Sequence, residues 1–395
     1  MNALLSTSQI RRLFGYSIVA RMPIATLSVG VLLHAQHLTG SFAAAGIAAA
    51  ALAAGEGVGG PLLGRIADRR GQQTVLVAGA VGAAVALGLL AALPSGSPLV
   101  PIVVLSAVAG LCIPPVGACL RALLPGIVAP GDELQRAYAA EATGSELTWI
   151  AGPPLMLLAA TAASTRIALL AGAAALLGAT IGFALQPATR DWGPEPRAAG
   201  SRGGSLRSPA VRTLVAVLVA VGIVFGAVEV AVTVAATSLG STAAAGPLLG
   251  VWGAGSLAGG ALVSRRGGPR SGFGLAVLLL GMAVGHMALV ATTGSAIAMA
   301  LVLALAGGTI APTYASVNAM VESVAPAGTI TEAFAWLNTA VGMGAALGSA
   351  VGGALAAGYG AGPAFVFAGA AGLAAAMLAL RCETTESPVA DASAA

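Results

Sequence analysis

A few carboxyl and guanidinium groups stand alone inside long apolar segments of this sequence, where they could do chemistry. Glu146 and Glu229 are the clearest cases, because no basic residue on a neighbouring segment shares their depth. Burial of an unpaired carboxyl favours its neutral form, so such a group can take up and release a proton. We expect both residues to couple proton movement or to contact a substrate. The alternatives are a permanently protonated carboxyl, hydrogen-bonded within the protein, and a carboxylate that faces a wet cavity.

Arg21 and Glu56 form a second candidate group. They lie on consecutive apolar segments that run in opposite directions, each about eight residues, or about 12 Å, from the same end. This matched depth predicts an ion pair between them. The pair would be a structural salt bridge or part of a proton relay, and we favour the structural role.

The stretch GRIADRRGQQ, residues 64–73, is a dense charge cluster between two apolar segments. Four of its ten residues are charged, against 8% of the whole chain, so it must lie where water reaches it. Arg121 and Glu141 lie at the ends of two later segments, near the same face. We therefore expect them to pair with Asp68 in a ring of charges. The alternative is that both are simply hydrated at that face.

Other polar and aromatic side chains are scarce in the apolar segments, since only 4% of the residues are aromatic. Each of them is more often a packing or interface residue than a ligand contact. They are nevertheless the contacts that a substrate would find in a largely apolar cavity. The candidates are Trp149, Tyr314, Asn318, Trp336 and Asn338.

The motifs of the common enzyme classes are missing from the sequence. It contains no H-E-x-x-H, no cysteine–histidine cluster, no G-x-S-x-G and no P-loop. The three cysteines have no disulfide or metal-ligand spacing, so we expect neither a metal nor another cofactor. The net charge of +4 follows the positions of the arginines along the chain and does not indicate a nucleic-acid partner.

Composition indicates that membrane-spanning helices position these residues. The chain is 57% hydrophobic, its mean hydropathy is +0.93, and apolar runs of membrane-spanning length recur along it. We predict an all-α membrane protein with twelve transmembrane helices, near residues 13–36, 42–64, 73–93, 98–121, 136–161, 165–186, 209–237, 243–263, 271–293, 295–321, 331–357 and 361–381.

The basic residues predict the orientation of these helices. With a cytoplasmic N-terminus, sixteen of the 18 arginines fall on the cytoplasmic side, whereas only Arg166 falls outside and Arg21 lies within a helix. Both termini are therefore expected in the cytoplasm, and the protein in the plasma or inner membrane.

The sequence divides into two similar halves. GALVSRRGGP at 260–269 repeats GRIADRRGQQ after 196 residues, and EAFAWLNTA from 332 repeats RAYAAEATG from 136 at the same displacement. We predict two parallel six-helix halves, a cytoplasmic linker between them, and a disordered tail. Parallel repeats place a binding site near the bilayer midplane and can rock about it. The predicted boundaries are 1–186, 187–208, 209–382 and 383–395.

Twelve helices in two parallel halves, with this charged loop between the second and third, resemble the major facilitator superfamily of secondary transporters. Its signature, G-x-x-x-D-(R/K)-x-G-(R/K)-(R/K), is similar to the loop at Gly64, Asp68, Arg69 and Gly71, although glutamines occupy the last two positions. The resemblance implies that Asp68 latches the halves together at a cytoplasmic gate, near the start of the eleventh helix.

The residues at the start of the eleventh helix suit such a latch. A carboxylate gains from the dipole at a helix N-terminus, and Thr329 and Thr331 are expected to cap that terminus. Ser264 replaces the aspartate in the second half, so the latch should be asymmetric. The alternative is that the loop is only a tight, solvated turn.

The fifth predicted helix carries GSELTWIAGPP, which partly resembles the glycine–proline signature of exporters in this superfamily. Gly152 and Pro153 match it, and the glycine pair that usually follows is missing. Glycines at four-residue spacing recur in the second-half counterpart, at Gly344, Gly348 and Gly352. Such residues let helices approach closely, so helix packing is the alternative to an exporter signature.

These features favour a proton-coupled secondary transporter that exports small, largely apolar compounds, such as a drug or a metabolite. Its expected partners are the small-molecule substrate, protons and the lipid bilayer, and it is expected to act as a monomer. The alternatives are a proton symporter that imports a small organic solute and a transporter-like membrane sensor without flux.

Overall fold

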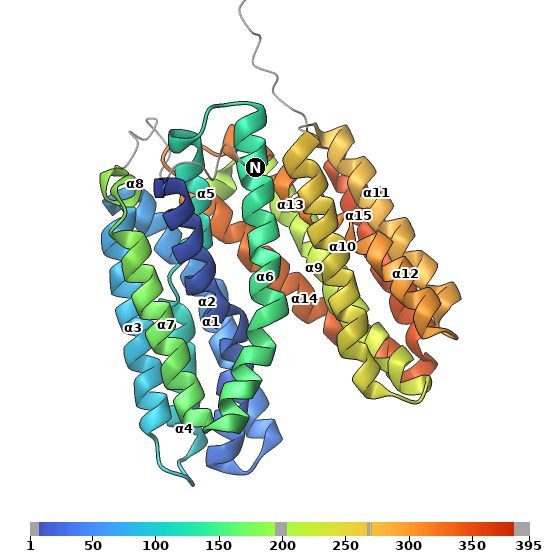
Figure 1. Cartoon of the computed structure of the whole chain (residues 1–395), viewed down its shortest axis with the longest axis horizontal. Coiled ribbons are helices and arrows are strands. Elements are labelled where there is room, and N and C mark those ends of the chain that lie inside the picture. The colour runs from blue at the N-terminus through green and yellow to red at the C-terminus, as the bar shows by residue number, and fades with distance from the viewer. Residues whose placement is uncertain (1–7, 194–203, 267–268, 270, 383–395) are drawn as a thin grey trace, which may run out of the picture.

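The computed structural model describes residues 8–193, 204–266, 269 and 271–382, apart from the side chains of residues 150, 153 and 154. The described residues form helices and connecting turns, with no strand. The first half of the chain contains α1 (Ser8–Thr39), α2 (Phe42–Arg70), α3 (Gln72–Ala92), α4 (Leu99–Cys112), α5 (Val116–Ile127), α6 (Asp132–Ala162) and α7 (Thr165–Ala184), as Figure 1 shows.

The second half repeats this order. It contains α9 (Pro209–Ser238), α10 (Ala245–Arg266), α11 (Gly272–Ala288), α12 (Ala296–Gly307), α13 (Ile310–Val324), α14 (Ile330–Tyr359) and α15 (Ala361–Ala379). Within the expected linker, the structure places the short helix α8 (Pro187–Asp191) and a 3-10 turn (Ser205–Arg207). The centre of the linker, 194–203, and the expected tail, 383–395, lie outside the described residues.

These helices make twelve crossings, six in each half. Eleven stretches among the described residues are long and apolar enough to span a membrane, if α4 with α5 and α12 with α13 are each taken as one crossing. The remaining crossing is α6, which has 31 residues and carries Glu141 and Glu146. The twelve-helix, all-α fold predicted from the sequence is therefore confirmed.

Two of the predicted helices are interrupted at equivalent positions. The segment expected at 98–121 breaks between α4 and α5 at residues 113–115, and the segment expected at 295–321 breaks at residues 308–309. The breaks lie close to the displacement of the sequence repeat, since position 113 in the first break corresponds to position 309 in the second. Pro114 and Pro115 have no backbone N–H to give to a continuous helix, which explains the first break.

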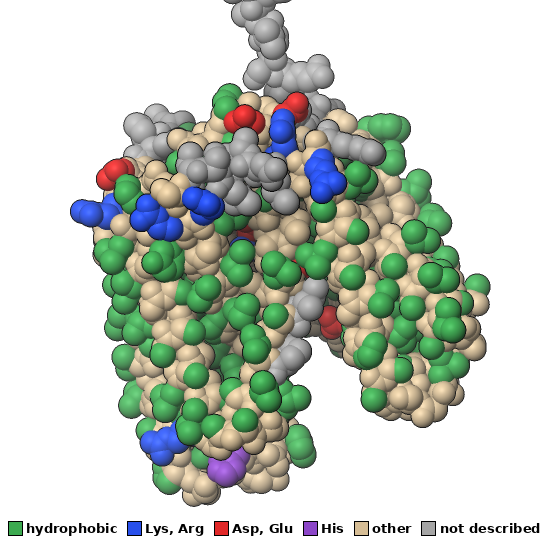
Figure 2. Space-filling model, viewed as in Figure 1, with side chains coloured by type: hydrophobic (Ala, Val, Ile, Leu, Met, Phe, Trp, Pro, Cys, Tyr) green, Lys and Arg blue, Asp and Glu red, His purple; other side chains and the backbone are tan. Residues whose placement is uncertain are grey.

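The two halves touch at one end of the bundle and separate at the other. Figure 1 shows α1–α7 on the left and α9–α15 on the right, and α2 packs against α14 while α6 packs against α10. Figure 2 shows a wedge-shaped hollow between the halves, and arginine side chains gathered at the end where the halves meet. We call this the arginine-rich end; it carries Arg65, Arg69 and Arg70 at the end of α2.

Glycine lets α14 lie directly on α9 within the second half. A Cβ on Gly344 or Gly348 would collide with the backbone of Val219 or Ile223, and one on Gly352 would crowd Ala227. In the first half, a Cβ on Gly152 would meet Thr26 of α1 at 2.5 Å. The expected side-chain role of Pro153 lies outside the described residues.

Gly348→Ala should lower the thermal stability of the purified protein, because its methyl group would force α14 away from α9. Overpacking of this kind costs about 1–3 kcal/mol. Gly342→Ala is the matched control, since Gly342 lies on the same helix with nothing within 4 Å of an added Cβ. Melting temperatures measured in detergent test this. Equal melting temperatures for the two variants would contradict the packing assignment.

Candidate functional site

Asp68 caps α14 from the opposite half of the molecule. The backbone N–H of Thr331 donates to Asp68 Oδ1 at 3.0 Å, and that of Glu332 donates to Oδ2 at 2.8 Å. The first N–H groups of a helix have no partner within the helix, so the carboxylate satisfies two of them and adds a favourable charge. The carboxylate is buried, with 2% of Asp68 exposed.

The expectation that Thr329 and Thr331 cap this helix was wrong. Thr329 occupies the N-cap position, but its side chain makes no capping hydrogen bond and instead donates to the carbonyl of Pro326. Thr331 lies inside the first turn, where its own backbone N–H needs an acceptor. Asp68 takes the role that the threonines were expected to fill.

Two glycines of the charged loop allow Asp68 to reach α14. A Cβ on Gly64 would lie 3.0 Å from the carbonyl oxygen of Thr331 and 3.1 Å from Cα of Glu332, so glycine permits the close approach of the two helices. Gly71 ends α2 with a φ of +90°, a conformation that L side chains rarely adopt. It lets α3 begin at once on the other side of the turn.

Arg65 and Glu332 add an ion pair between the halves that the sequence analysis missed. Arg65 Nε and Nη2 donate to the two carboxylate oxygens of Glu332, both at 3.0 Å. The spacing of Arg65 and Asp68 could have indicated this pair. Residues three apart lie on the same face of a helix, so Arg65 points towards the same end of α14 as Asp68. We call Asp68, Arg65, Glu332 and the N–H of Thr331 the latch. Arg69, which was expected at the gate, is exposed and has no ion pair with a described residue.

A second charged group, the central cluster, lies beside the latch. Arg21 Nη1 and Arg121 Nη1 both contact Glu141 Oε1, at 2.6 Å and 3.1 Å. Arg21 Nη1 also donates to Ser145 Oγ at 2.6 Å, and Arg121 Nη2 donates to Asn338 Oδ1 of α14 at 3.0 Å. The central cluster therefore joins α1, α5 and α6 of one half to α14 of the other.

Two predicted pairings were wrong. Arg21 pairs with Glu141 rather than with Glu56, which has no ion pair with a described residue. Equal depth in two helices does not place two side chains on facing sides. Arg121 and Glu141 do not join Asp68 in a ring, because the carboxylate oxygens of Asp68 are taken by the N–H groups of α14. The charges form two groups instead of one.

The two isolated glutamates differ in their surroundings. Glu146 is partly buried on α6 and faces Ser256 of α10, across the contact between the halves. Ser256 is fully buried, and its Oγ has no hydrogen-bond partner among the described residues. Glu229 is exposed on α9, as expected for the alternative in which the carboxylate faces a cavity.

The five cavity candidates are dispersed. Asn338 holds Arg121 and is exposed, whereas Asn318 is buried and Trp336 is partly buried. Tyr314 packs on Phe225, with 6.4 Å between the ring centroids. Trp149 is 64% exposed. Only Asn338 contacts a charged group of the central cluster.

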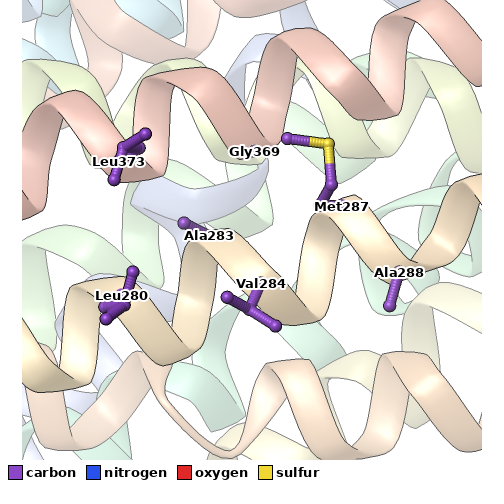
Figure 3. A pocket seen from close by; sticks show the side chains of 7 residues that line it. All are labelled: Leu280, Ala283, Val284, Met287, Ala288, Gly369 and Leu373. Atoms are coloured by element: carbon purple, nitrogen blue, oxygen red, sulfur yellow. The ribbon is translucent and has the colours of Figure 1, made fainter.

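An apolar groove on the second half is separate from these groups. It lies between α11 and α15, and the side chains that line it carry no polar group (Figure 3). A surface without polar groups cannot fix the orientation of a bound solute by hydrogen bonds. We therefore take the central cluster as the candidate site.

Comparison with known proteins places these features in a family. The family model described as Major Facilitator Superfamily matches residues 13–331 and 253–395. No curated protein matches the sequence.

Solved structures share the fold at low sequence identity. The human organic anion transporter MFSD10 (TETRAN) is 14% identical, with a TM-score of 0.67 over 95% of this chain and 100% of that one. The proton:xylose symporter XylE bound to 6-bromo-6-deoxy-D-glucose is 16% identical, with a TM-score of 0.65 over 93% and 92%. A bacterial homologue of the iron transporter ferroportin, in an outward-facing state with soaked iron, is 15% identical, with a TM-score of 0.73 over 95% and 99%.

Asp68→Asn should sharply reduce transport and leave expression and membrane insertion intact, because an amide offers α14 one acceptor oxygen and no charge. Arg70→Gln, at an exposed position two residues later on α2, is the control. Transport by membrane vesicles measures the effect. A wild-type rate in the Asp68→Asn variant would remove the latch from the mechanism.

Proposed function

This chain belongs to the major facilitator superfamily, and from that premise we propose that it is a proton-coupled secondary transporter. It works by alternating access and exports small, largely apolar compounds. The observation that carries this proposal is the arrangement of the halves, which are latched at one end and open at the other. It acts as a monomer in the plasma or inner membrane.

The positive-inside rule supports assigning the arginine-rich end to the cytoplasm. The hollow then opens to the outside, and the latch closes the cytoplasmic end. Transport requires the opposite state, in which Asp68 leaves α14 and water enters between α2 and α14. The latch is suited to this exchange, because its partners are backbone N–H groups and charges that water can also solvate.

The position of Glu146 supports proton coupling. It lies where α6 meets α10, a contact that must change when the halves rock. A carboxyl at such a place is exposed to one side in one state and to the other side in the next. A proton supplies about 2.3 kcal/mol per 100 mV, and a difference of one pH unit adds about 1.4 kcal/mol. Together they support a substrate gradient of several hundredfold without ATP.

Proton symport of a small organic solute is the second candidate. The central cluster favours it, because Arg21 and Arg121 put two cations beside one carboxylate and could hold a charged solute. The structural neighbours carry different cargoes by name, at identities of 14–16%, so they support the fold and do not choose between the candidates.

Glu146→Gln should abolish pH-driven accumulation and retain substrate exchange, since glutamine keeps the shape of the neutral acid and cannot release a proton. Gradient-driven flux and counterflow, measured in the same proteoliposomes with a panel of dyes and antibiotics, separate the two activities. Uphill pumping by this variant at the wild-type rate would show that Glu146 is not the proton carrier.

Two control variants accompany that experiment. Glu133→Gln changes an exposed glutamate at the start of α6 and should keep both activities. Glu229→Gln should keep them as well, because Glu229 is exposed in this state. Loss of accumulation in Glu229→Gln alone would move the proton carrier from α6 to α9.

A further inference from the structure

The central cluster carries an uncompensated positive charge. Two guanidinium groups, those of Arg21 and Arg121, share the single carboxylate of Glu141, which gives a formal charge of 2 − 1 = +1. The three side chains are 11%, 7% and 1% exposed. A charge withdrawn from water is costly unless an opposite charge accompanies it, so the cluster lacks one negative group.

Two N–H positions of the central cluster are unused. Arg21 Nε donates to the carbonyl of Ser17, and its Nη1 donates to Glu141 and Ser145, whereas Nη2 is buried without a partner among the described residues. In Arg121, both Nη atoms are bonded, and Nε is buried without such a partner. A buried donor without an acceptor has lost its hydrogen bond to water and gained none in return, which is destabilising. A single negatively charged group with hydrogen-bond acceptors could therefore supply both the missing charge and the missing acceptors.

The geometry of the central cluster is fixed before any ligand arrives. Arg121 stacks over the ring of Phe334, with its guanidinium carbon 5.3 Å from the ring centroid. A Cβ on Gly117 would come within 3.3 Å of Arg21 Cδ, so glycine at this position makes room for the arginine. A site with such constraints loses little entropy on binding.

Asn338 connects the central cluster to open space. Its amide oxygen accepts a hydrogen bond from Arg121, and the residue itself is exposed. It lies on α14 next to Thr339, whose hydroxyl donates to the carbonyl of Gly57 on α2, so its exposed side chain stands at the contact between the halves. A ligand that enters between the halves would therefore meet Asn338 first and the arginines behind it.

We propose that Arg21 and Arg121 bind the carboxylate of a small organic monoanion whose apolar body lies in the hollow. This inference rests on the proposed transport function and narrows its substrates to apolar compounds with one carboxylate. Guanidinium groups match the planar, two-oxygen geometry of a carboxylate. One negative charge neutralises the cluster, and a dianion would leave an excess charge behind.

Binding of matched pairs to the purified full-length protein tests the proposal. Benzoate and octanoate are compared with benzamide and octanamide at constant ionic strength, by calorimetry and by thermal shift. The acids should bind at least ten times more tightly than their amides, which corresponds to about 1.4 kcal/mol. Equal binding of acid and amide, or no binding of either acid, would overturn the proposal, because water alone would then occupy the site.

A series of charge variants locates the binding. Arg121→Gln makes the cluster neutral and should weaken benzoate binding at least tenfold, whereas Glu141→Gln raises its charge to +2 and should strengthen binding. The double variant restores +1 and should recover part of the loss, even where the single arginine variant folds poorly. Arg136→Gln removes a partly exposed arginine of α6 that lies outside the cluster, and it should change nothing. Affinity that does not follow the charge of the cluster would overturn the assignment.

Failure of this inference can be distinguished from failure of the proposed function. Glu146→Gln should bind benzoate as the wild type does while losing pH-driven accumulation. Carboxylate binding without any flux would support the site and reject the transporter. Proton-driven flux of neutral compounds, without carboxylate binding, would support the transporter and reject the carboxylate site.

Discussion

The structure depends on the need of a helix N-terminus for hydrogen-bond acceptors. The first N–H groups of α14 cannot be satisfied within the helix, and its own threonines do not cap it. The acceptors come from Asp68 on the other half, so the cap is also the joint between the halves. Gly64 follows from the same requirement, since any side chain there would hold the two helices apart.

The repeat creates two equivalent joints, and they carry different residues. Ser264 occupies the position of Asp68 in the second half, and its hydroxyl donates to the carbonyl of Ala261 in its own helix. A hydroxyl brings no charge to a helix N-terminus, and α6, the counterpart of α14, has no side-chain cap at Gly131. The halves are thus alike in backbone, and only the joint between α2 and α14 brings a carboxylate of one half to a helix N-terminus of the other among the described residues.

The sequence predicted the features that depend on position along the chain. It missed the contacts that depend on the direction in which a side chain points from its helix. Apolar length predicted the crossings, and a constant displacement predicted the repeat. Depth along a helix suggested Glu56 as the partner of Arg21, but the direction in which a side chain points depends on how the helices pack, and Glu141 is the partner. The pair of Arg65 with Glu332 was missed for the same reason, because it joins helices far apart in the chain.

One helix links the latch to the central cluster. Glu332 and Asn338 lie six residues apart on α14, or about 9 Å along its axis. The first contacts Arg65 and the second contacts Arg121, and next to Asn338 the hydroxyl of Thr339 donates to the carbonyl of Gly57 on α2. A ligand that competes with Asn338 for Arg121 would release one of these contacts and leave α14 held by the latch and by Thr339. Because a helix moves as a rigid element, occupancy of the cluster and closure of the gate would then bias the same two-state motion.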